Sequence, residues 1–159
     1  MEFRLHYCET TCPKVQEIPG ARGICYWLRE PIVWVDEEGK HHEVPVGFVN
    51  DGFSIPSFAK GVIRGLKSRV PAYVHDWQFL THEAGSLKLT NYNIRRGIVL
   101  TGGGRWNAMK AGTGLWLGGW YAWGQYGYEL ETLGYDAVVR RRIAETETQA
   151  IRIANIGRI

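Results

Sequence analysis

The segment VPVGFVNDGFSIP at residues 44–56, followed by VPAYVHDWQF at residues 70–79, marks the place where the chain changes from strand-forming to helix-forming sequence. Before it, short segments rich in β-branched and aromatic residues predict strands. After it, apolar residues recur three and four positions apart, which predicts helices. A carboxylate, a hydroxyl, a histidine and turn-forming glycines also lie closest together here. We therefore expect the fold and any chemistry to be organised around this segment.

Upstream, three apolar segments predict a small antiparallel sheet. They are Ile24–Arg29, Ile32–Val35 and His41–Val46, and their composition is typical of strands joined by hairpins. Pro45 places the last of them at an edge or a strand end, because proline has no N–H to donate to a neighbouring strand. Residues 50–52 are Asn-Asp-Gly, which predicts a turn because these residues tolerate a positive φ.

Downstream, the pattern predicts several helices. Pro56 and Pro71 suit the first turns of two helices, and Thr90 is a candidate N-cap for a third that ends at the glycines of residues 102–104. Helical spacing returns from Val138 onward. The order of these elements predicts an α+β fold, with a small antiparallel sheet in the N-terminal half packed against several C-terminal helices.

The length of 159 residues is that of one domain. We expect this single α+β domain to span residues 23–144. Residues 1–22 contain two prolines and a late glycine, so we expect an irregular N-terminal segment. Residues 145–159 are expected to form a C-terminal tail or helix extension whose order depends on docking.

Composition excludes some classes of protein. Apolar content of 45% and charged content of 22% are those of an ordinary globular domain. The net charge of +3 comes without a stripe of Lys and Arg, so no nucleic-acid partner is expected. Cys8, Cys12 and Cys25 are an odd number of cysteines, which favours free thiols in a reducing compartment over a disulfide framework. The N-terminus lacks the basic and apolar regions of a signal peptide.

Residues 111–128 form an uncharged run that contains six glycines and many Trp and Tyr residues. Its length admits a membrane span, although Trp and Tyr prefer the membrane interface to its centre. The favoured prediction is a buried helix whose glycines permit close backbone contact. Insertion into a membrane or a partner subunit stays open as the alternative.

Four residues are candidates for chemistry: Asp51, Ser54, His75 and Asp76. His75 and Asp76 are about 100° apart on a helix that begins near Pro71, so both side chains can reach one ion at the helix edge. One hypothesis is a divalent-metal site made by Asp51, His75 and Asp76, with a metal-bound water as the nucleophile. Another makes Ser54 the nucleophile and His75 its base, without the Gly-x-Ser-x-Gly turn usual for such serines.

A purely structural role for the same residues is also open. Asp51 can stabilise its own turn, and Ser54 can cap the helix at Pro56. His75 can be an interior histidine that is hydrogen-bonded to Asp51. The sequence alone therefore leaves open whether the protein is an enzyme.

At these residues the chain resembles a phage-associated family known as domain of unknown function 1353. The resemblance extends from about Ile24 to Gly127 and rests on Val44-Pro45-x-Gly47-Phe48-Val49-x-Asp51-Gly52-x-Ser54-Ile55-Pro56 and on Val74-His75-Asp76. The family tends to carry an aspartate at the start of the following helix, where this chain has Asn91 or Asn93. Asparagine supplies no charge and accepts no proton at neutral pH. If that aspartate completes a metal site or acts as a base, the resemblance implies that this protein has lost activity.

The resemblance implies a phage or prophage origin and a gene near tail and lysis functions, without an established reaction. We expect a phage-encoded accessory protein of the virion, tail or assembly pathway. It would act by binding other phage proteins or further copies of itself, in the virion or the host cytoplasm. One alternative is a small metal-dependent hydrolase that acts on the cell wall or another host target through Asp51, His75 and Asp76. A second alternative is a lysis factor that contacts the membrane through residues 111–128.

Overall fold

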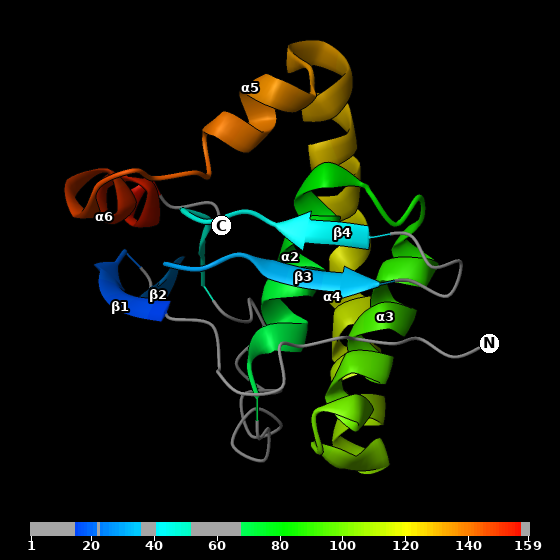
Figure 1. The fold of residues 1–159 in the computed structure, drawn as a ribbon. Coiled ribbons are helices and arrows are strands. Elements are labelled where there is room, and N and C mark those ends of the chain that lie inside the picture. Colours follow the sequence, from blue (N-terminus) through cyan, green and yellow to red (C-terminus); the bar gives the residue numbers. More distant parts are fainter. Residues whose placement is uncertain (1–14, 22, 36–40, 52–67, 157–159) are drawn as a thin grey trace. The chain divides into compact units, whose positions relative to one another are not determined.

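The computed structural model describes residues 15–21, 23–35, 41–51 and 68–156, which fall into two compact units (Figure 1). The sheet unit comprises Met1–Gly52 and Arg140–Ile159, and the helical unit comprises Phe53–Val139. A small antiparallel sheet in the N-terminal half and several C-terminal helices confirm the α+β fold class. The domain boundaries expected from the sequence, at residues 1–22, 23–144 and 145–159, stay a prediction.

In its described residues, the sheet unit has five short strands in two antiparallel sheets. Strands β1 (Val15–Gly20), β2 (Gly23–Leu28) and β5 (Val49–Asn50) form one sheet in the order β1-β2-β5. Strands β3 (Ile32–Val35) and β4 (His41–Val44) form the other. The strands predicted from β-branched and aromatic content are therefore present, and the last two pair as a hairpin.

Strand β1 departs from the expected irregular segment. It pairs with β2 along its whole length, from Val15 opposite Leu28 to Gly20 opposite Gly23. Pro19 lies within it, and β1 is the edge of the sheet formed by the described strands, where a missing N–H is tolerated because that side of the strand needs no ladder donor. The proline therefore marks the edge of the sheet.

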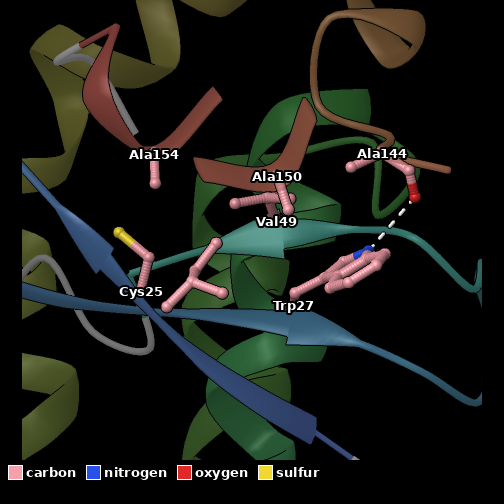
Figure 2. Close-up of a cluster of buried hydrophobic side chains, with 7 residues drawn as sticks. Cys25, Trp27, Val49, Ala144, Ala150 and Ala154 are labelled. Atoms are coloured by element: carbon pink, nitrogen blue, oxygen red, sulfur yellow. Dashed lines mark hydrogen bonds between the residues drawn. The ribbon is translucent and has the colours of Figure 1, made fainter. Parts of the chain in front are cut away.

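The core of the sheet unit joins the strands to the C-terminal part of the chain (Figure 2). Its buried residues are Ile18, Cys25, Trp27, Val49, Ala144, Ala150 and Ala154. The indole Nε1 of Trp27 donates a hydrogen bond to the carbonyl oxygen of Ala144 over 3.1 Å. Helix α6 (Glu147–Asn155) begins with a capping box between Thr146 and Gln149. The C-terminal segment is thus a packed part of this unit.

The backbone at residue 47 explains why the segment at residues 44–56 contains a glycine there. Its φ is +90°, and an added Cβ would lie 2.6 Å from the carbonyl oxygen of Ala144. The Ala144 amide donates to the Gly47 carbonyl over 2.9 Å. A side chain at residue 47 would therefore disturb both its own backbone and the close approach of residues 143–144.

The helical unit is built on α2 (Val70–Thr81), α3 (Leu87–Leu100) and α4 (Gly104–Leu133), with α5 (Tyr135–Arg140) following after a bend at Gly134 (Figure 1). Pro71 lies in the first turn of α2 as expected. The N-cap of α3 is Ser86, whose hydroxyl accepts from the Leu89 amide, so the prediction of Thr90 as the cap is wrong. Thr90 lies one turn further on and donates its hydroxyl proton to the Ser86 carbonyl. Both residue types suit a cap, and the helix begins at the earlier one.

Residues 111–128 are helical and belong to α4, but the expectation that they are buried holds for one face only. Ala108 and Ala111 pack against Ile94 and Ile98 of α3. Most aromatic side chains of α4 lie on the opposite face and are exposed. None of the helices in the described residues is long and apolar enough to cross a membrane.

The helical pattern that begins at Val138 is divided between α5 and α6. The residues between them lie along β5, where the Val49 amide donates to the carbonyl of Arg142 over 2.9 Å. The helix predicted to begin near Pro56 lies outside the described residues, as do Cys8 and Cys12.

Candidate functional site

The structure describes three of the four predicted site residues. Asp51 follows β5 in the sheet unit, whereas His75 and Asp76 are on α2 in the helical unit. Ser54 lies outside the described residues. The grouping of Asp51 with His75 and Asp76 therefore stays a prediction.

In the sheet unit, Asp51 belongs to the electrostatic environment of Cys25. Burial raises the pKa of the Cys25 thiol, the Asp51 carboxylate raises it further, and Arg142 acts in the opposite direction. A thiol with a raised pKa stays protonated at neutral pH and is a poor nucleophile or metal ligand. Cys25 is thus a structural residue of the core shown in Figure 2.

In the helical unit, His75 lies at the contact between α2 and α3 and is 4% exposed. Its Nε2 is 3.2 Å from Oδ1 of Asn91, and its Nδ1 is 3.5 Å from Oδ1 of Asp76. The Phe79 ring lies one turn along α2, with its centroid 5.2 Å from that of the imidazole. His75 therefore shares a helix face with Phe79, as the helical spacing predicts.

The orientation of the Asn91 amide determines the tautomer of His75. A neutral imidazole carries one N–H, so it cannot donate to both Asp76 and the Asn91 oxygen. The Asn91 nitrogen Nδ2 is buried and has no hydrogen-bond partner among the described residues. Turning the amide by 180° lets Nδ2 donate to Nε2, while Nδ1–H donates to Asp76; such amide assignments follow from the hydrogen-bond network. With the amide turned in this way, both ring nitrogens of His75 are engaged.

The side chains on both sides of His75 keep unsatisfied polar atoms. Oδ2 of Asp76 is buried without a hydrogen-bond partner in the described part of the chain, and so is Nδ2 of Asn91 as long as its amide is not turned. A buried polar group without a partner costs about 1–3 kcal/mol, and such costs are uncommon outside functional or strained sites. The cluster of His75, Asp76 and Asn91 is therefore the candidate site of the helical unit.

The structure also distinguishes between the two asparagines. Asn91 faces His75, whereas the Asn93 amide donates to Oε1 of Gln78 over 3.2 Å. The neutral residue beside the histidine is thus Asn91. Among the described residues, no group of three or more His, Cys, Asp or Glu residues could hold a metal ion.

A second histidine of α2, His82, makes contacts that the sequence did not predict. It ends the helix with φ +55° and stacks on Trp123 of α4, with ring centroids 3.7 Å apart and planes 5° apart. Its Nε2 donates to the Trp123 carbonyl over 3.1 Å. Burial lowers the pKa of His82, and this hydrogen bond acts in the opposite direction. An added Cβ on Gly127 would lie 3.1 Å from the His82 ring. The absence of a side chain at residue 127 therefore leaves room for the ring to pack against α4.

These observations describe an α+β protein with a histidine-centred polar cluster between two helices. The family model described as "Protein of unknown function (DUF1353)" matches residues 26–109. The match covers more than half of the chain, and the chain therefore belongs to this family, as the resemblance at residues 44–56 and 74–76 indicated. No curated protein and no solved structure matches the chain. The matched region includes His75, Asp76 and Asn91 and ends within the first turns of α4.

Proposed function

We propose that this protein is a phage-encoded accessory protein that acts by binding protein, in the virion, in the tail or during assembly. The observation that supports this proposal is the aromatic face of α4. We define this face by its exposed large side chains, which are Trp106, Met109, Trp116, Trp120, Tyr121 and Tyr128.

The residues of the aromatic face lie on one side of the helix. At 100° per residue its six side chains fall within an arc of about 140°. Trp116 and Trp120 are each 68% exposed and Tyr128 is 67% exposed. Large apolar patches on a soluble protein mark interaction sites, and Trp and Tyr dominate the energetics of protein interfaces. Scattered exposed residues would not produce this alignment on one side of one helix.

The cluster of His75, Asp76 and Asn91 fits a structural role better than a catalytic one. With the Asn91 amide turned so that Nδ2 donates to Nε2, His75 uses both ring nitrogens within the cluster, which leaves no lone pair for a substrate or an ion. Asn91 supplies no charge beside it. A small metal-dependent hydrolase that acts on the cell wall or another host target is the second candidate. The unsatisfied Oδ2 of Asp76 beside His75 favours it.

Mass spectrometry of purified particles of the encoding phage tests the proposal. We expect the protein to be retained on particles or assembly intermediates, and retention to fall when Trp116 and Trp120 are both replaced by alanine. Leu100→Ala is the matched control, because Leu100 is an exposed apolar residue of α3 outside the aromatic face. Absence of the wild-type protein from particles and from assembly intermediates would refute the proposal.

The hydrolase candidate has its own test. Metal analysis and thermal unfolding of the purified protein, with and without a chelator, are compared with the same measurements on His75→Ala and Asp51→Ala. Co-purifying metal that both substitutions remove would favour the hydrolase over the binding protein.

A further inference from the structure

We infer that the aromatic face of α4 binds a second copy of this chain, with the two α4 helices antiparallel. This inference rests on the proposed function, namely that the face binds protein, and it adds the identity of the partner. Three features of the face support it: its shape, the charges at its ends and its area.

The shape of the face is complementary to itself. Gly124 lies on the same side of α4, between Trp120 and Tyr128, and is exposed. An added Cβ on Gly124 would meet no atom within 4 Å, so the face has an open notch beside large rings. In an antiparallel pair centred on Trp120, Trp116 of each copy lies opposite the partner's Gly124. Rings of one copy then enter the notch of the other, as close packing at an interface requires.

The charges at the two ends of the face favour an antiparallel arrangement. Lys110 and Glu131 are exposed on the same side of α4 as the aromatic residues, and residues 111–128 between them carry no charge. In a pair centred on Trp120, Lys110 lies within one residue of the position opposite the partner's Glu131. A parallel pair would bring like charges together. The dipoles of two antiparallel helices attract each other, which also favours the antiparallel arrangement.

The area of the face is sufficient for a stable dimer. An aromatic side chain has roughly 150–250 Å² of surface to bury, and the five aromatic residues of the face are 63–68% exposed. Covering them removes roughly 500–800 Å² per copy. The pair therefore buries about 1,000–1,600 Å², which reaches the range of specific protein interfaces, about 1,200–2,000 Å².

Other occupants fit the face less well. A membrane surface or a nucleic acid that binds through phosphate groups calls for a row of cations beside the aromatic residues. Within the arc of the face, the described cation is Lys110, which lies over the Trp106 ring at 5.3 Å from the centroid; exposed Arg105 lies just outside the arc, and two cations at one end do not make a row. No helix of the described segments could span a membrane. A second copy needs no cations, because it presents the same uncharged face.

The oligomeric state of the purified full-length chain tests the inference, by sedimentation velocity over a series of protein concentrations. We expect a concentration-dependent dimer. Trp116→Ala with Trp120→Ala, and separately Gly124→Leu, should each raise the dissociation constant at least tenfold. Gly124→Leu fills the notch and replaces glycine by a stronger helix former, so it disrupts pairing without unfolding α4. Leu100→Ala should dimerise as the wild type does.

A charge exchange tests the orientation. Lys110→Glu alone and Glu131→Lys alone should each weaken the dimer, and the double variant should restore it. Single variants without effect would refute the antiparallel arrangement. A protein that stays monomeric at the highest concentration, or a dimer unaffected by Gly124→Leu, would refute the inference as a whole.

Different experimental results would refute the inference and the proposed function. A monomeric protein that is retained on particles through Trp116 and Trp120 refutes only the second-copy partner. A dimer that is absent from particles and assembly intermediates refutes the phage accessory role. Flotation of a monomeric protein with vesicles of neutral and anionic phospholipid, lost in the Trp116→Ala, Trp120→Ala variant, would assign the face to a membrane and refute both.

Discussion

The contact between His75 and Asn91 yields a quantitative prediction about the candidate site. Asn91→Leu removes the partner of a buried imidazole nitrogen 3.2 Å away, and a buried polar atom that loses its partner costs about 1–3 kcal/mol. His75→Phe similarly leaves the Asn91 amide, which is 6% exposed, without that partner. Removing both groups together costs less, because neither is left unsatisfied. The double variant should therefore lose about 1–2 kcal/mol less than the sum of the two single variants.

The measurement is a double-mutant cycle by urea unfolding, with thermal unfolding as a second probe. For a chain of this size each kcal/mol corresponds to about 2–4 °C in Tm. Asn93→Leu combined with His75→Phe is the matched control, because Asn93 bonds to Gln78 and its effect should add to that of His75→Phe. Additivity of His75→Phe and Asn91→Leu within about 0.3–0.5 kcal/mol would refute the hydrogen bond as described.

Three further predictions concern the sheet unit, the cap of α3 and the contact of α2 with α4. Gly47→Ala should destabilise the protein by more than the roughly 1–2 kcal/mol of a left-handed backbone, because its Cβ also meets the Ala144 carbonyl at 2.6 Å. Gly23→Ala, with φ +136° and no atom within 4 Å of the added Cβ, should lose less in the same urea titration; equal losses would contradict the close contact. Ser86→Ala should cost about 1 kcal/mol through loss of the N-cap, seen as a lower Tm, whereas an unchanged Tm would place the cap elsewhere. Burial lowers the pKa of His82 in the folded state below its ordinary value of 6.5, so the stability from its neutral form is present above about pH 6.5 and is lost as the pH falls below it. His82→Phe should flatten the dependence of unfolding free energy on pH between about 7 and 5, and an unchanged slope relative to the wild type would refute this.

Local sequence patterns predicted the elements whose signals are local. Strands β2, β3 and β4 have the expected composition, and α2 begins at its proline. Strand β1 was not predicted because Pro19 and Gly20 look like breakers, and only the pairing with β2 makes this segment an edge strand. Pairing between distant segments is not encoded in a short window.

The candidate site was predictable only in part, because some of its contacts join residues that are far apart in the sequence. Residue types and helical spacing identified His75 and Asp76 as a pair. The choice between Asn91 and Asn93 depends on how α3 packs against α2, and the sequence alone could not make it. Trp123 and Gly127 likewise meet His82 only because α4 lies against the end of α2.

The exposed face of α4 illustrates a limit of hydrophobicity as a signal. Trp and Tyr make residues 111–128 apolar on every side, and a helix that is apolar all round is expected to be buried. Residues such as Trp116 and Trp120 are instead 68% exposed. An exposed aromatic face has the same composition as a buried core, so sequence patterns do not separate the two.

The order of the two units along the chain has a consequence for how the protein is made. The helical unit is an insertion, because the sheet unit begins before it and is completed only by residues after Arg140. Trp27 and Val49 are synthesised before the helical unit, whereas Ala144, Ala150 and Ala154, which cover them, are synthesised after it. A nascent chain cannot finish its N-terminal core until translation reaches α6. A product cut short after α5 lacks the side chains of α6 that cover this core, which leaves apolar surface open to chaperones and proteases.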